Sequence, residues 1–435
     1  MLEYLRLKNV GPAPEMEMEL APRLNLITGD NGLGKSFLLD AAWWALTRKW
    51  PNEVNRRMTS GYMARPTDMR TPAEIELRLT SKTKGVSYTS TYSPRDEAWI
   101  GKAGRPWNPG LVIYAHADGS FSVWDPTRNY WKKKGNADVQ ERLPAFVFSP
   151  SEVWDRLTVT IDGRPTVACN GLITDWAGWI TENGTRARAM ALALKQLSPS
   201  SDPRDEIRPG TLTRVSVNDS RDIPTIRTPY AAEVPIIYAS SGVRRITALA
   251  YMLLWSWLEH ALAAKLLGEE RTNQVIVLVD EIEAHLHPRW QRAILRSVLG
   301  LAAEMHPRAT LQVIAATHSP LILASAEPIF DSETDAWFDL DLNRESSRVE
   351  LRRRDFVRHG DVSHWLTSEA FDLKSARSLE GEIAIEKARA LLREPAPSPE
   401  RAKDVDAELR HAGLPDIDPF WVRWGKFLED IGATQ

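Results

Sequence analysis

The chain contains 435 residues, of which 43% are hydrophobic and 26% are charged, and its net charge is −3. This composition is ordinary for a globular protein, and the near-neutral charge excludes a general polyanion binder, so nucleic-acid contact would need a local patch. The single cysteine, Cys169, excludes an internal disulfide and a zinc site built from thiolates, and it suits a reducing compartment.

Neither the first residues nor the most apolar segment of the chain suggests export or membrane insertion. The start, Met1-Leu2-Glu3-Tyr4, has neither the charged region nor the long apolar core of a signal peptide. The most apolar long segment, residues 246–267, is interrupted by Glu259, His260 and Lys265, which argues against a membrane span. We therefore expect a cytoplasmic protein that contacts no membrane.

Three short strands are predicted over residues 2–10, 15–20 and 24–28, and the third leads into a glycine-rich turn. The residues that follow are Gly29-Asp30-Asn31-Gly32-Leu33-Gly34-Lys35-Ser36-Phe37, of which the first eight match the phosphate-loop pattern G-x-x-x-x-G-K-[ST]. A helical pattern over residues 36–49 completes the strand–loop–helix context. Backbone N–H groups of such a loop bind phosphates, Lys35 would reach the β- and γ-phosphates, and Ser36 would ligate Mg²⁺. ATP and Mg²⁺ are the predicted ligands; a glycine turn with an unrelated lysine is the alternative.

The middle of the chain is predicted to be mixed in character. Residues 73–93 and 110–125 alternate like antiparallel strands, and a helix is predicted over residues 175–197. The Pro-, Ser- and Asp-rich residues 198–229 are expected to be irregular, and a strand over residues 234–239 to lead into a helix over residues 243–267. No heptad repeat occurs, so no coiled-coil arm is expected.

Two continuous apolar runs, residues 275–279 and 311–316, predict strands buried on both faces of a mostly parallel sheet. Asp280 follows the first run, where a carboxylate would be costly without a cation, so it is predicted to hold Mg²⁺; a helix cap is the alternative. Glu281 would act as the catalytic base that orients or deprotonates water. His318 follows the second run and could contact the γ-phosphate, unless it is a structural histidine.

Ser240, Ser241 and Gly242 stand at the start of the long predicted helix. A small Ser/Gly turn at a helix N-terminus is an anion site, although ordinary helix caps have the same composition. With the phosphate loop before it, and the Asp-Glu strand and the histidine after it, this segment completes the motif order of ABC-type ATPases. The chain resembles that superfamily.

The resemblance implies that Ser240, Ser241 and Gly242 contact the nucleotide bound to a second copy, so that ATP joins two heads in a homodimer or higher oligomer. It also leads us to expect that Arg244 and Arg245 face the partner head or its phosphates. The chain departs from the common L-S-G-G-Q signature at three positions. Residues 146–152, where the family's glutamine loop is expected, contain no glutamine, so no residue is assigned to that role.

The run D-E-I-E-A-H-L-H-P, residues 280–288, resembles the branch with the RecF, OLD and SMC-type heads, and residues 362–378 resemble the tail of stand-alone ATPases of bacterial anti-phage modules such as Septu and the retron-linked systems. That resemblance implies a separate effector, a nuclease of the HNH or Toprim type. A fused Toprim domain is disfavoured, because Asp339-Leu340-Asp341 has no companion glutamate motif. A zinc site at His285 and His287 lacks a third ligand. Lys132-Lys133-Lys134 and Arg352-Arg353-Arg354 are candidate DNA contacts, solvated faces being the alternative.

We therefore predict an α/β fold, a phosphate-loop NTPase of the ABC-head type with a mostly parallel core sheet, an antiparallel β lobe, a helical signature lobe and a C-terminal helical extension. The predicted domains are residues 1–149, 150–270, 271–356 and 357–435. Within the last parts, strands are predicted over residues 336–342 and 348–355, a helix over 379–392, and a short helical tail after the prolines of 395–399. The predicted activity is slow, regulated ATP hydrolysis that controls an effector in anti-phage defence. The alternative is a RecF-like clamp on DNA.

Overall fold

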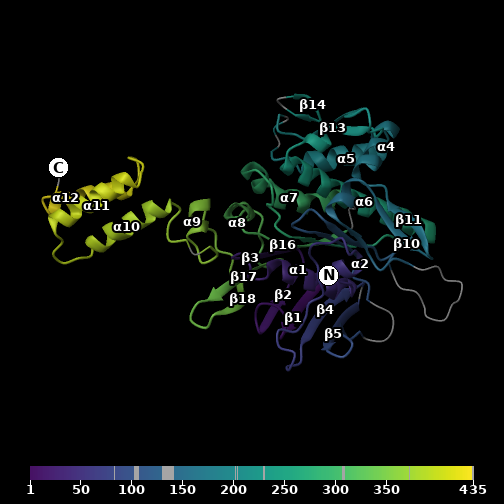
Figure 1. Cartoon of the computed structure of the whole chain (residues 1–435), viewed down its shortest axis with the longest axis horizontal. Helices are drawn as coiled ribbons and strands as arrows, with labels where there is room; N and C mark the ends of the chain where they lie inside the picture. The colour runs from purple at the N-terminus through teal and green to yellow at the C-terminus, as the bar shows by residue number, and fades with distance from the viewer. Residues whose placement is uncertain are drawn as a thin grey trace. The chain divides into compact units, whose positions relative to one another are not determined.

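The computed structural model describes residues 1–82, 84–101, 107–129, 142–200, 202, 204–228, 231–305, 309–371 and 373–433. The chain divides into two compact units, Met1–Gly360 and Asp361–Gln435 (Figure 1). The finer boundaries predicted at residues 150 and 271, inside the first unit, remain predictions. No helix among the described residues is both long and apolar enough to cross a lipid bilayer.

An eight-stranded sheet lies at the centre of the first unit, in the order β18-β17-β3-β16-β15-β7-β8-β9. Its five neighbouring strands from β17 to β7 run parallel, whereas the strands at both edges are antiparallel. Strands covered on both faces need apolar residues at every position, which explains the continuous runs in β15 and β16. The bounds are β3 Leu24–Gly29, β7 Leu111–Ala115, β8 Phe121–Trp124, β9 Phe146–Phe148, β15 Gln274–Val279, β16 Thr310–Ala316, β17 Asp335–Asn343 and β18 Arg348–Arg354.

The predicted mostly parallel core sheet is thus confirmed, with one correction. Residues 110–125 were expected to be antiparallel strands, but β7 pairs in parallel with β15 and only β8 turns back against it. The sequence pattern could not give the pairing direction of β7, because the side chains of a strand alternate between its two faces whether the neighbouring strand runs parallel or antiparallel.

A second, antiparallel sheet packs against the first across helix α1, Lys35–Thr47. It has the order β2-β1-β4-β5-β6, with the bounds β1 Leu2–Lys8, β2 Glu15–Glu19, β4 Glu74–Ser81, β5 Lys84–Ser93 and β6 Ala98–Trp99. Helix α1 contacts strands of both sheets, and Trp43, Trp44 and the leucines beside them are buried in one apolar core with side chains of both. Because the two sheets cover α1 on most sides, apolar residues occur on most sides of this helix. The short helix α2, Pro51–Val54, follows it.

The opposite face of the core sheet is covered by other helices of the first unit (Figure 1). Helix α6 contacts β7, helix α7 contacts β16, and α8 packs on α7. Their bounds are α6 Ser241–Leu267, α7 Pro288–Met305 and α8 Pro320–Ala326. The core sheet is therefore the middle layer, and its strand ends are the places where functional loops can emerge.

The region between β9 and α6 is more ordered than predicted. The helix expected over residues 175–197 is two helices, because Asn183 takes a left-handed conformation (φ 49°) and ends the first of them. Residues 198–229, expected to be irregular, contribute two strands of a three-stranded antiparallel sheet. Of the strand expected over residues 234–239, only the first two residues are extended, at the end of the third strand of this sheet, and residues 236–238 form a 3₁₀ helix. The bounds are α3 Pro150–Trp154, β10 Leu157–Ile161, β11 Arg164–Cys169, α4 Leu172–Glu182, α5 Thr185–Gln196, β12 Arg208–Thr213, β13 Ile223–Thr228, β14 Ala231–Pro235 and η1 Ile236–Tyr238.

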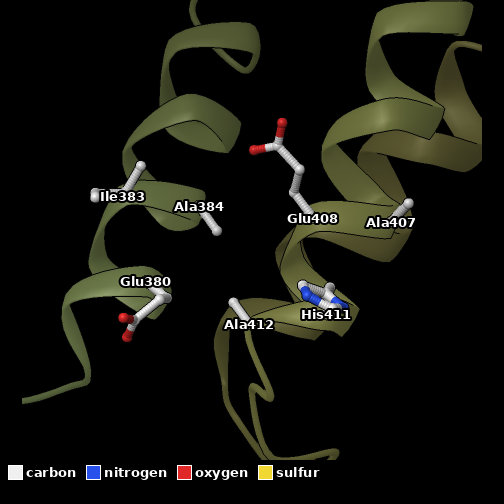
Figure 2. Close-up of a pocket in the computed structure, with 7 residues that line it drawn as sticks. All are labelled: Glu380, Ile383, Ala384, Ala407, Glu408, His411 and Ala412. Carbon is white, nitrogen blue, oxygen red and sulfur yellow. The ribbon is translucent and has the colours of Figure 1, made fainter.

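The second unit is helical, and its end is longer than the short tail that was predicted. It contains α9 Val362–Leu366, α10 Leu379–Leu391, α11 Pro399–His411 and α12 Phe420–Asp430. The last three helices share one apolar core, in which the Trp424 side chain is fully buried. An open pocket lies between α10 and α11 (Figure 2), and its lining residues are Glu380, Ile383, Ala384, Ala407, Glu408, His411 and Ala412.

Replacing Trp424 by alanine should unfold this core while leaving the first unit folded. The indole is 0% exposed and its Nε1 donates to Asp406 Oδ1 at 3.0 Å, so truncation removes both packing and a buried hydrogen bond. We expect a loss of about 3–5 kcal/mol, close to the whole stability of so small a unit. Hydrogen exchange of the full-length protein should show fast exchange in α10–α12 only. Val422→Ala is the matched control, since Val422 lies on the same helix and is 80% exposed; equal exchange in both variants would contradict the prediction.

Candidate functional site

The carboxyl ends of four neighbouring parallel strands, β3, β16, β15 and β7, meet at one edge of the core sheet. The strand register sets this arrangement: Ile27 lies opposite Ala316, and Val279 lies opposite both Ala315 and Ala115. The residues that follow these strands are therefore neighbours although the chain separates them widely. In open α/β sheets ligands bind outside such strand ends.

The phosphate-loop residues Gly29 to Phe37 occupy this edge between β3 and α1, as the sequence predicts. Gly29 has φ +135°, and a Cβ atom there would lie 2.3 Å from the Leu340 carbonyl oxygen, so only glycine fits. Gly34 is the N-cap residue of α1. The N-terminus of this helix, with its unpaired N–H groups, is therefore directed to the loop.

Lys35 lies inside the loop and is only 5% exposed. Its Nζ donates to the carbonyl oxygens of Gly29 at 2.6 Å and Asp30 at 2.8 Å. Burial lowers the pKa of Lys35, and the Asp280 carboxylate opposes this shift. The ammonium group is held at a defined point beside a loop rich in N–H donors, which is the arrangement a phosphate group requires.

Asp280 is the first residue after β15, and its backbone N–H donates to the Ala115 carbonyl oxygen at 2.9 Å. The Ser36 hydroxyl lies close enough to the Asp280 carboxylate to lower its pKa, so the two predicted metal ligands are adjacent. Burial raises the pKa of Asp280 to about 6. Its Oδ1 atom is buried and has no hydrogen-bond partner among the described residues. A buried carboxylate oxygen without a donor, next to a hydroxyl, fits the oxygen ligands that Mg²⁺ prefers.

Glu281 and His318 lie around the same point. Glu281 has φ +47°, a conformation that costs energy for a side chain of this kind, and its carboxylate interacts electrostatically with Lys35 and His318. The His318 ring lies close to the Gly29 backbone. Burial, followed by the positive charge of Lys35, lowers the pKa of His318, so the ring is neutral at pH 7. The fold thus brings Lys35, Ser36, Asp280, Glu281 and His318 together.

Ser240 is the N-cap residue of α6 and accepts a hydrogen bond from the Val243 N–H at 3.4 Å. Ser240 and Ser241 are exposed, whereas Gly242 is buried against the backbone of the segment after β15. The expectation for the following arginines is wrong for Arg245. Its guanidinium donates to the carbonyl oxygens of Ala117 at 3.1 Å and Asp280 at 3.3 Å, within its own subunit. Arg244 lies over the Trp154 ring at 4.9 Å.

Two residues at this edge were not predicted. Glu283 accepts hydrogen bonds from the residues after β16, and Asp118, after β7, accepts one from the Thr59 hydroxyl at 2.6 Å. For Glu283 the spacing D-E-x-E was a usable signal, since a second acid so close to a buried strand needs a partner. For Asp118 the sequence contained no usable signal, because the position of this residue at the site depends on the pairing of β7 with β15.

The other candidate residues have ordinary structural partners. Asp339 is 2% exposed, accepts a hydrogen bond from the Thr28 hydroxyl at 2.7 Å and pairs with Arg354 at 3.4 Å. Arg352 pairs with Glu350. Two of the three arginines of this cluster are therefore used within the strand pair β17–β18. The lysine cluster at residues 132–134 lies outside the described residues.

A protein-family profile described as "AAA domain, putative AbiEii toxin, Type IV TA system" matches residues 24–324. This match covers more than two thirds of the chain and runs from β3, before the phosphate loop, through His318. The chain belongs to this family. This family match agrees with the predicted phosphate-loop ATPase, and the strand order confirms the predicted α/β fold with a mostly parallel core sheet and an antiparallel β lobe. Membership of an AAA family implies nucleotide binding and ATP hydrolysis.

The "Retron Vc95 probable ATPase" of Vibrio cholerae serotype O1 biovar El Tor is 30% identical over 121 residues, 25% of this chain and 21% of that protein. The match thus spans about a fifth of the relative. Three solved structures also match over 81% of this chain: the SMC head domain from Thermotoga maritima (13% identity, 99% of that chain, TM-score 0.38), the SmcHead bound to the C-winged helix domain of ScpA (13%, 97%, 0.42), and an Smc head domain with an extended coiled coil bound to the C-terminal domain of ScpA derived from Pyrococcus furiosus (12%, 96%, 0.39).

Proposed function

We propose that this AAA-family protein binds Mg-ATP at the carboxyl edge of its core sheet, hydrolyses it slowly, and joins a second copy of itself through the bound nucleotide. The observation that carries the proposal is the buried, donor-free Oδ1 of Asp280 beside Ser36 and Lys35. A buried carboxylate suited to hold a cation, next to a lysine held in a phosphate loop, supports phosphoryl transfer more than any other reaction.

Each residue at the site has one proposed task. The loop N–H groups and Lys35 bind and orient the triphosphate, and Ser36 and Asp280 would hold Mg²⁺, which supplies charge neutralisation at the phosphates. Glu281 orients the attacking water and accepts its proton. His318 contacts the γ-phosphate position from the segment that directly follows β16.

The proposed dimer rests on the exposed start of α6. Ser240 and Ser241 are exposed at the N-terminus of a helix of 27 residues, and Tyr238, just before them, is 67% exposed. The positive end of a long helix, with two exposed serine hydroxyls and an exposed aromatic ring, suits a phosphate group carried by another molecule. A second copy offers such a phosphate at its own loop.

We further propose that ATP-dependent association controls an effector, a nuclease of the HNH or Toprim type, in anti-phage defence. The retron named in the description of the Vibrio relative supports this assignment. A DNA clamp has less support, because Arg352 and Arg354 already pair with acids of the strand pair β17–β18. The effector, the oligomer beyond the dimer and the cytoplasmic location are parts of this proposal.

The test is the light-scattering mass of Glu281→Gln with and without Mg-ATP. The chain has a mass of 49.0 kDa, and we expect ATP to double the measured mass. Ser240→Arg, which puts a bulky side chain at the contact, should prevent this. Ser378→Arg is the matched control, because Ser378 is the exposed N-cap residue of α10 and its loss costs a similar cap energy. A mass that does not change with ATP would contradict the proposed dimer.

A further inference from the structure

One carboxylate holds the segment that carries His318. Glu283, in the turn after β15, accepts a hydrogen bond from the His318 backbone N–H on Oε1 at 2.5 Å and one from the Thr317 hydroxyl on Oε2 at 2.7 Å. The Thr317 hydroxyl also accepts from the Ser319 N–H at 3.0 Å. Both oxygens of Glu283 are therefore used on the two residues that directly follow β16.

Backbone hydrogen bonds and backbone conformation fix the turn that carries Glu283. The Ala284 N–H donates to the Glu281 carbonyl oxygen at 2.8 Å, and the Leu286 N–H donates to that of Glu283 at 2.9 Å. Glu281 and His285 both have left-handed φ values, +47° and +61°. Non-glycine residues keep such conformations only where the surroundings fix them. The position of the Glu283 carboxylate is thus set by the turn and not by rotation of a free side chain.

The same turn contacts the start of α6. A Cβ atom on Gly242 would lie 2.7 Å from the His285 carbonyl oxygen, so the two backbones are in direct contact. On one side the turn therefore touches the segment proposed to face a second copy, and on the other it holds the residue that faces the γ-phosphate position.

We propose that Glu283 is a positioning residue that makes the site distinguish ATP from ADP by holding His318 at the γ-phosphate position. The proposal rests on the nucleotide site proposed above and adds a residue to it. ADP has no γ-phosphate, so its binding depends on the phosphate loop and not on His318. Removal of the carboxylate leaves the buried Thr317 hydroxyl and the His318 N–H without their acceptor, and the segment then moves to recover hydrogen bonds elsewhere.

The test compares nucleotide affinities in Glu281→Gln protein, where hydrolysis is blocked, by isothermal titration calorimetry. Glu283→Ala should weaken Mg-ATP binding about tenfold and leave Mg-ADP binding within about twofold, the effect of one lost charge-assisted contact. Glu283→Gln keeps an oxygen acceptor for the His318 N–H and should restore most of the ATP affinity. His318→Ala should weaken ATP binding as much as Glu283→Ala does, and the double variant should be no worse.

Equal weakening of ATP and ADP would show that Glu283 only supports the fold, and additive effects with His318→Ala would show that it acts elsewhere; either result overturns the inference. Hydrogen exchange of the nucleotide-free protein gives an independent answer. Glu283→Ala should speed exchange at residues 317–320, and unchanged exchange there would also overturn it. If the parent protein binds neither nucleotide, the proposed function fails, and the exchange result still decides whether Glu283 positions this segment.

Discussion

Lys35→Ala is expected to abolish ATP binding and hydrolysis together. The ammonium group lies inside the phosphate loop, 2.6 and 2.8 Å from two loop carbonyl oxygens, so a methyl group in place of the side chain removes this cation from the loop. A polyphosphate would bind there because fixed donors and a fixed cation replace its water shell at no cost of reorganisation. We expect Mg-ATP affinity to fall at least about a hundredfold and the hydrolysis rate at least about a thousandfold.

The measurements are calorimetric titration with Mg-ATP and phosphate release under saturating nucleotide. Lys49→Ala is the matched control, since Lys49 is an exposed lysine just beyond the other end of the same helix. It should behave as the wild type does. Near-normal turnover of Lys35→Ala would contradict both the site and the activity proposed for it.

Glu281→Gln is expected to separate binding from chemistry. The glutamine has the same shape and hydrogen-bonding reach, but it cannot accept the proton of the attacking water. Because the change leaves Lys35 and the loop untouched, Mg-ATP affinity should stay within about threefold, while kcat falls about a hundred- to a thousandfold. The left-handed backbone at Glu281 costs glutamine about as much as it costs glutamate, so the fold should be unaffected.

Single-turnover kinetics with labelled ATP will measure the chemical step directly. Glu270→Gln, at an exposed position shortly before the same strand, is the matched control and should hydrolyse ATP at the wild-type rate. If Glu281→Gln lost affinity and rate in parallel, Glu281 would be a binding residue, and another acid would have to be the base. Glu283 and Asp118 are the described acids to examine first in that case.

Local sequence predicted the parts of the site that are contiguous in the chain. A phosphate loop works through its own backbone N–H groups and the helix that follows, so its nine residues and their flanking pattern contain nearly all the information. In the same way, an apolar run that ends in two acids indicates a buried strand with a charge at its end, which β15 and Asp280 confirm. The helix break at Asn183 was missed because an apolar pattern continues on both sides of a two-residue turn.

The sequence by itself predicted a nucleotide as the ligand and identified the two strands that carry the acid and the histidine, because each of these depends on residues close together in the chain. Only the tertiary structure decided which strands are neighbours. Lys35 and Asp280 meet because β16 pairs with β3 and with β15 in one particular register, a choice made by packing over the whole sheet. The roles of Glu283 and Arg245 follow from that choice. Each binds a backbone group from a distant segment, and such a partner leaves no trace in the local pattern.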